Sequence, residues 1–186
     1  MRCLPKPELA WLLVLLIALV SPFARAEGID VRHAALAASD EGYVLEVDFD
    51  IALNSAVEET LNKGVALNFV LEFELQRPRW YWFSEKVAQI AQPYKLSYNA
   101  LTRQYRVSLG TLFQNFPSLV DAVGFMSRIR GVVAAERGVL RRGETYAAAV
   151  RLRLDVSQLP KPFQLNALGS REWSLGTDWH RWTVAP

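Results

Sequence analysis

Cysteine is almost absent from this chain: Cys3 is the only one among 186 residues, and it lies close to the N-terminus. Residues 27–186 therefore offer no disulfide, no thiol nucleophile and no cysteine ligand for a metal. Their stability must come from packing, and these 160 residues are enough to bury a substantial core.

The motifs of several enzyme classes are also missing. The sequence has no Gly-x-Ser-x-Gly segment, which positions the nucleophile of many serine hydrolases, and no glycine-rich loop for phosphate. Asp178 and His180 would form a metal site or an acid–base pair if the fold placed them beside His33. Because this spacing is common, surface or capping histidines are the simpler interpretation. We predict no catalytic residue, no metal site and no cofactor.

Five carboxylates alternate along two segments, where a facing pair would suit glycoside cleavage. They are Glu46, Asp48, Asp50, Glu72 and Glu74. Their regular alternation is more typical of the solvated face of a sheet. We expect them to lie opposite Arg151 and Arg153 as cross-strand ion pairs, which contribute about 0.2–1 kcal/mol each and help to set the register.

Long apolar runs are confined to the N-terminus. The segment Leu9–Val20 is apolar over 12 residues, with Arg2 and Lys6 before it and Ala24-Arg25-Ala26 after it. This order predicts a signal peptide over residues 1–26, cleaved after Ala26, and one exported domain over residues 27–186 in the periplasm. The alternative is an uncleaved segment that anchors the protein to the inner membrane, although a spanning helix needs about 20 apolar residues.

Charge is balanced overall but divided between the two halves of the exported part. Residues 27–99 hold 6 basic and 12 acidic residues, whereas residues 100–186 hold 12 basic and 6 acidic residues. The halves either pair within one domain, or the basic half forms a face for an anionic component of the envelope. A neutral exported domain argues against a nucleic-acid partner.

Alternating apolar residues predict a mainly β protein. The clearest strands are Tyr43–Leu53 and Leu67–Gln76, each with one apolar and one polar face, which indicates an antiparallel sheet. Other strands and hairpins are predicted at residues 29–38, at 94–98 with 104–109, at 132–140 with 145–154, at 163–168 and at 173–175.

Capping residues predict two helices, near 55–63 and 118–130. Ser55 would cap the first helix, which leads either to a parallel strand or across to a second sheet. Residues 84–92 suit a strand or a helix, and residues 159–162 read as an extended connector. Together these elements predict an antiparallel, two-layer, β-sandwich-like domain with two short α-helices.

Four segments carry a resemblance to a known family: Arg77-Pro-Arg-Trp-Tyr-Trp82, Leu154-Asp-Val-Ser-Gln-Leu-Pro-Lys-Pro162, Ser170-Arg-Glu-Trp173 and Asp178-Trp-His-Arg-Trp182. With the N-terminal segment, they resemble the exported proteobacterial family catalogued as domain of unknown function 4390. The resemblance covers essentially the whole exported part and implies a location in the bacterial envelope. It implies no activity, ligand or catalytic residue.

Aromatic residues and arginines are concentrated in two segments, and together they suit recognition of protein, sugar or lipid headgroups. The candidate binding residues are Arg77, Arg79, Trp80, Tyr81, Trp82, Arg171, Trp173, Trp179, Arg181 and Trp182. The alternative is that these aromatics belong to the core, with arginines stacked across them.

The sequence thus predicts a non-enzymatic binding module of the envelope. Its partner would be an envelope protein or the ectodomain of a membrane protein, and its oligomeric state stays open. The alternatives are a glycan- or lipid-binding protein, or a hydrolase that acts on an envelope polymer.

Overall fold

Strand β3 (Leu67–Arg77) is at the centre of the larger of two sheets. In the computed structural model, its five apolar side chains at alternate positions are buried, and the residues between them are partly exposed. The strand pairs antiparallel with β4 (Glu85–Asn99) on one side and β8 (Tyr146–Leu154) on the other. The alternation in the sequence therefore predicted both this strand and its buried face.

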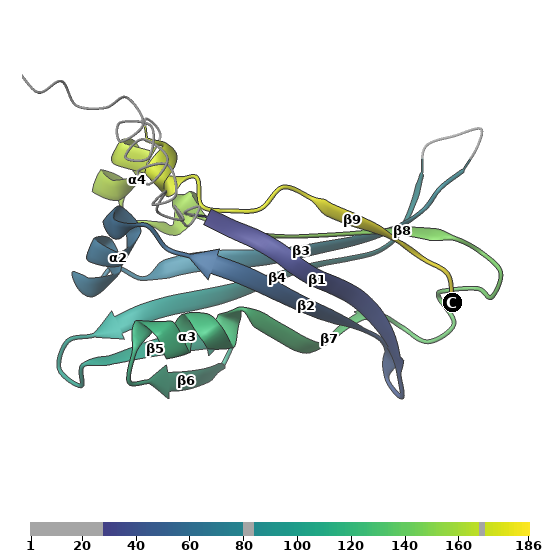
Figure 1. Ribbon diagram of the computed structural model, residues 1–186, viewed down its shortest axis with the longest axis horizontal. Coiled ribbons are helices and arrows are strands. Elements are labelled where there is room, and N and C mark those ends of the chain that lie inside the picture. Colours follow the sequence, from purple (N-terminus) through teal and green to yellow (C-terminus); the bar gives the residue numbers. More distant parts are fainter. Residues whose placement is uncertain (1–27, 80–83, 168–169) are drawn as a thin grey trace, which may run out of the picture.

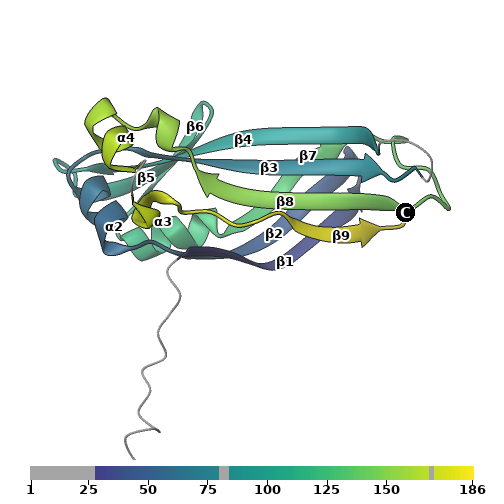
Figure 2. The same cartoon turned by 90° about the horizontal axis from the view of Figure 1, so that it is seen from above.

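The structure describes residues 28–79, 84–167 and 170–186, so the predicted signal peptide lies outside the described residues. Two antiparallel sheets pack face to face over a shared core (Figures 1 and 2), with strand orders β1-β2-β7 and β6-β5-β4-β3-β8-β9. The remaining strands are β1 (Gly28–Ser39), β2 (Gly42–Ala52), β5 (Gln104–Leu109), β6 (Leu112–Phe116), β7 (Arg128–Ala135) and β9 (His180–Val184). The predicted mainly β, antiparallel, sandwich-like fold is confirmed.

Helix α2 (Ser55–Asn62) joins the two sheets, because the strand before it belongs to the smaller sheet and the strand after it to the larger one. Asn54 caps the helix, one residue before the predicted cap Ser55: its Oδ1 accepts a hydrogen bond from the backbone N of Val57 at 2.9 Å. The Asn54 amide nitrogen also donates to the backbone oxygen of Glu172 at 2.5 Å. This second bond ties the start of α2 to the C-terminal part of the chain.

Helix α3 (Leu119–Met126) begins at the predicted cap, Ser118, but ends before residue 130. Arg128 and Arg130 belong to β7, and Arg128 lies opposite Asp48 of β2. The two arginines are therefore strand residues, and their predicted place at the end of a helix is wrong. Pairing with β2 overrides the helical preference of this segment.

The prediction for the chain after β8 is also wrong. In place of an extended connector and a strand at 163–168, the structure has a 3₁₀ turn, η1 (Val156–Gln158), and the helix α4 (Lys161–Ala167). Pro160 and Pro162 lie where this helix starts, and there a missing backbone N–H costs no intrahelical hydrogen bond. A second 3₁₀ turn, η2 (Arg171–Trp173), and a single bridge at Gly176 replace the strand predicted at 173–175.

One of the two predicted hairpins is confirmed and the other is wrong. β4 and β5 pair with Leu96 opposite Val107, as the hairpin at 94–98 and 104–109 requires. In contrast, β7 pairs with β2 and β8 pairs with β3, so the chain crosses between the sheets after residue 135. Alternation shows which face of a strand is buried, but it does not identify the neighbouring strand.

The predicted ion pairs on the polar faces occur within each sheet. Glu72 accepts hydrogen bonds from Arg151 and Arg153 of β8, as expected. Glu74 pairs instead with Lys86 of β4. Glu46, Asp48 and Asp50 belong to the other sheet, where Asp48 pairs with Arg130 and Asp50 with Arg32. Their predicted pairing with β8 is wrong, because the two outer faces point away from each other.

No helix in the part of the chain that the structure describes combines the length and the apolar character needed to cross a membrane.

Candidate functional site

Arg77 and Arg79, two of the predicted binding residues, are engaged in ion pairs at the end of β3. Both contact Glu85 at the start of β4, and Arg77 Nη1 also lies 3.0 Å from Glu144 Oε2. Hydrogen bonds from Arg77 and Arg79 lower the pKa of Glu85. The ion pairs of these arginines connect the end of β3 with the start of β4 and with the segment that contains Glu144. Trp80, Tyr81 and Trp82, which follow them in the chain, lie outside the described residues.

The three C-terminal tryptophans do not form one surface. Trp173 is only 6% exposed and packs against Phe163, with ring centroids 6.2 Å apart. Trp182 is half-buried between the sheets, 6.1 Å from the ring of Phe73. Trp179 is half-buried, and the guanidinium carbon of Arg151 lies 4.4 Å from the centroid of its ring.

Arg171 and Arg181, the last two predicted binding residues, are exposed. The structure thus separates the C-terminal aromatic group into one core residue, Trp173, and two half-buried residues.

The two histidines considered for a metal site or an acid–base pair lie on different strands. His33 lies on β1 and His180 on β9, in different sheets. Nowhere in residues 28–79, 84–167 and 170–186 do three His, Cys, Asp or Glu side chains come close enough to hold a metal.

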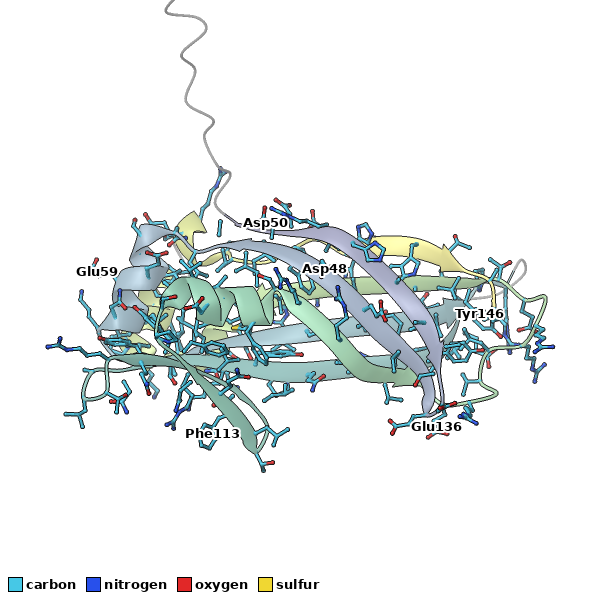
Figure 3. The ribbon with its side chains drawn as sticks, turned by 60° about the horizontal axis from the view of Figure 1, so that its bottom comes forward. Asp48, Asp50, Glu59, Phe113, Glu136 and Tyr146 are labelled. Atoms are coloured by element: carbon cyan, nitrogen blue, oxygen red, sulfur yellow. The ribbon has the colours of Figure 1, made fainter. Side chains whose placement is uncertain are left out.

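Asp48, Asp50 and Glu72, three of the acidic residues of the strands, are ion-pair partners. Asp48 and Asp50, on the outer face of the smaller sheet (Figure 3), are held by arginines. Burial alone would raise the pKa of Glu72, but hydrogen bonds and charge from Arg153 and Arg151 outweigh it, and the pKa is lowered. Because its pKa is lowered, Glu72 is ionised at neutral pH, and the two arginines neutralise its charge.

A different region brings together four of the large apolar side chains that are exposed among the described residues. Leu112 is 72% exposed, Phe113 61%, Val120 81% and Phe125 45%. They come from the β5–β6 hairpin and from α3, which packs on that hairpin (Figure 1). We call these four residues the hairpin–α3 surface, in which Phe113 lies on the face of the hairpin that points away from α3. Clustered apolar exposure of this kind marks interaction sites on globular proteins.

The difference in size between the sheets explains this exposure. The larger sheet has six strands and the smaller has three, so β5 and β6 extend past the smaller sheet. Helix α3 covers part of their apolar face: Phe125 packs on Phe116, with ring centroids 5.3 Å apart. Eight residues of helix are too short to cover both strands, and Leu112 stays uncovered.

A groove of about 580 Å³ continues this surface along the side of the sandwich, between β4 and β7. Its described lining is mainly apolar and contains two cations but no carboxylate: Ile90, Gln92, Tyr94, Leu109, Phe125, Arg128, Ile129, Arg130, Gly131, Val132 and Val133. Burial raises the pKa of Tyr94, which keeps its phenol neutral. Phe125 also lines a smaller hollow of about 190 Å³ under the hairpin, so the two spaces are adjacent.

The family model for the domain of unknown function DUF4390 matches residues 26–183 of this chain. The chain belongs to this family. No curated protein and no solved structure matches it. The function of this member of the DUF4390 family is therefore inferred from its own residues.

Sequence reasoning missed the hairpin–α3 surface because it did not predict β6. A signal was present: Leu112 and Phe113 are adjacent apolar residues directly after Gly110-Thr111. Neighbouring residues in a strand point to opposite faces, so one of two adjacent apolar residues must face away from the core. Two adjacent apolar residues beside a two-residue turn thus indicate that one of the two side chains is exposed.

Proposed function

We propose that this DUF4390 domain is a non-enzymatic binding module of the bacterial envelope, and that it contacts a protein partner through the hairpin–α3 surface. The observation that carries the proposal is the group of four apolar side chains at the edge of the larger sheet, exposed by between 45% and 81%. Interface energy is typically concentrated in a few large apolar and aromatic residues at the centre of a contact. Phe125 is a residue of this type on the face toward α3, and Phe113 is one on the other face of the hairpin.

The shape and lining of the site support a protein partner over the alternatives. A glycan site would present tryptophans along a groove, whereas the described lining of the groove between β4 and β7 includes none. A lipid site would be a closed cavity between the sheets, whereas this groove lies at the open side of the sandwich. Export to the periplasm rests on the N-terminal segment of the sequence. The aromatic–arginine segment 77–82 stays a prediction as a second contact.

Photo-crosslinking in the native envelope tests the proposal. A crosslinking amino acid at Phe125 should capture one protein, whereas the same amino acid at Leu165 should not. Leu165 is 73% exposed but lies on α4, away from α3 in both Figures 1 and 2. The captured protein, once purified, should bind the wild-type chain and lose at least about tenfold in affinity for a Leu112→Ser, Val120→Ser variant.

Both serines replace largely exposed residues, so the melting temperature of the variant should stay close to that of the wild type. The proposal fails if Phe125 and Leu165 give the same adducts, or if the double variant binds the captured protein as well as the wild type does. Adducts of glycan or lipid at Phe125 would also overturn it.

A further inference from the structure

Four strands form the edges of the two sheets: β1 and β7 in the smaller, β6 and β9 in the larger. Natural proteins protect such edges with bulges, charges, glycine or proline, because an unprotected edge pairs with other chains. Three of the edges here are protected. β1 has a bulge at Arg32, β7 has a bulge with Gly131 at φ 73° beside Arg130, and β9 carries the charge of Arg181.

Strand β6 has none of these devices. Its sequence, Leu-Phe-Gln-Asn-Phe, contains no charge, proline or glycine, and its register with β5 is unbroken. The first four of its five residues are exposed. Since β5 occupies only one side of the strand, the other side is an open template for a further strand.

The turn geometry indicates which backbone groups this edge presents. Leu109 and Leu112 flank a two-residue loop that begins with Gly110 at φ 59°, as in a type II′ turn. The pair that flanks such a loop is hydrogen-bonded, and pairs alternate from there along an antiparallel ladder. Phe113 and Asn115 therefore occupy the non-hydrogen-bonded pairs, and their backbone N–H and C=O groups point to the free edge.

The two faces beside this edge differ in chemistry. On the face toward α3, Leu112 borders a hollow of about 190 Å³ whose described lining carries no charge. On the opposite face, the Arg106 guanidinium lies 4.5 Å from the ring centroid of Phe113. Its Nε donates to Asn115 Oδ1 at 2.9 Å. No carboxylate among the described residues pairs with Arg106 within 4.0 Å, so its charge is available to an incoming strand.

We infer that the partner binds as an extended strand added to the free edge of β6, with apolar side chains on the face toward α3 and acidic ones on the face toward Arg106. This inference rests on the proposed function and specifies how the partner is recognised. Backbone hydrogen bonds to Phe113 and Asn115 supply affinity, and alternate side chains supply specificity. A second copy of this chain fits less well, because it brings another Arg106 to the same face.

Synthetic peptides of roughly eight residues test the charge and period. The first peptide alternates valine with glutamate, and the second alternates valine with lysine. The third contains the same valines and glutamates as the first, arranged as one block of each. The alternating acidic peptide should bind the wild-type chain at least about tenfold more tightly than either of the others. Equal binding of the acidic and basic peptides, or no binding of the acidic peptide, overturns the inference. Self-association through β6 that excludes the peptide does so as well.

Amide hydrogen exchange measured by NMR tests the geometry. On binding of the acidic peptide, the amides of Phe113 and Asn115 should exchange at least about tenfold more slowly. The amide of Gln114 faces β5, so its exchange should change much less. A partner that docks through side chains alone would not produce this alternation, and its absence contradicts strand addition.

Two substitutions at one position complete the test. Asn115→Ala removes the side chain that Arg106 contacts but keeps the backbone N–H, whereas Asn115→Pro removes both. Affinity for the acidic peptide should fall at least about fivefold more for proline than for alanine, with both variants folded by circular dichroism.

The same variants distinguish the docking surface from strand addition when the crosslinked protein replaces the peptide. If Leu112→Ser, Val120→Ser weakens its binding while the proline and alanine variants bind it equally, the docking surface stands and strand addition is wrong. If the double variant has no effect, the proposed function itself is wrong.

Discussion

Replacement of Glu72 by glutamine should destabilise the fold more than the same replacement of Glu74, two residues along the same face of β3. Glu72 Oε1 lies 3.2 Å from Arg153 Nη2, and Oε2 accepts from Arg151. Glu74 has one cationic partner, Lys86, with Nζ at 3.3 Å. The two carboxylates are similarly exposed, at 18% and 22%, so they form a matched pair for the comparison.

The contacts give the magnitude. Hydrogen bonds to charged groups contribute roughly 1.5–3 kcal/mol when buried, and exposed ion pairs about 0.2–1 kcal/mol. The arginine partners of Glu72 are 31% and 39% exposed, which places this site between the two cases. Glutamine keeps an acceptor but loses the charge. We therefore expect a loss of about 1–2 kcal/mol in the free energy of unfolding for Glu72→Gln, and under about 0.5 kcal/mol for Glu74→Gln.

Urea denaturation followed by tryptophan fluorescence measures both losses. With a slope of about 2 kcal/mol per molar urea, the midpoint for Glu72→Gln should fall by roughly 0.5–1 M. The pKa of Glu72 is lowered in the folded state, so its stabilisation is present above the unfolded pKa of about 4.3. That stabilisation is lost as the pH falls through the lower folded pKa, and the difference between wild type and variant should shrink below about pH 4.

Equal midpoints for the Glu72 and Glu74 variants at pH 7 would refute the reasoning. A difference between wild type and Glu72→Gln that grew as the pH fell would refute it as well, because the sign of the linkage would then be reversed.

Two further predictions concern backbone space and the core. A Cβ at Gly42 (φ 139°) would lie 2.4 Å from the backbone oxygen of Ala135, whereas one at Gly28 (φ 149°) meets nothing within 4 Å. Gly42→Ala should therefore lower the free energy of unfolding by about 1–3 kcal/mol more than Gly28→Ala does, as measured by thermal unfolding. Equal losses would count against the contact. Trp173→Ala should cost about 3–5 kcal/mol and the half-buried Trp179→Ala only about 1 kcal/mol, with similar losses contradicting their different burial.

Much of the fold could be predicted because periodicity depends on burial, and burial depends on the sequence locally. Residues Leu67–Gln76 alternate between apolar and mostly polar residues, and β3 spans this pattern and one further residue, Arg77. The partner of a strand depends on residues far along the chain, and no local pattern identifies it. Proximity in sequence therefore predicts a hairpin of 132–140 with 145–154, whereas the strand found there, β7, lies beside β2.

The candidate site was harder to predict because exposure depends on how the sheets overlap. Trp173 and Trp179 have similar surroundings in the sequence, with arginine close to each, yet one is buried and the other half-buried. Leu112 is apolar like the core residues, and it is exposed because the smaller sheet does not reach it. A composition-based argument gives the most weight to tryptophan and arginine, and it overlooks leucine and phenylalanine at the edge of a sheet.

The order of the strands also sets the course of folding. β1 with β2, and β3 with β4, β5 and β6, pair with neighbours along the chain and can assemble early. The second neighbour of β2 is β7, which begins at Arg128, and the second neighbour of β3 is β8, which begins at Tyr146. A nascent chain shorter than this exposes the apolar faces of two incomplete sheets, and such intermediates are prone to aggregate. Both sheets are completed by the last third of the chain, so they should fold and unfold together in one cooperative transition.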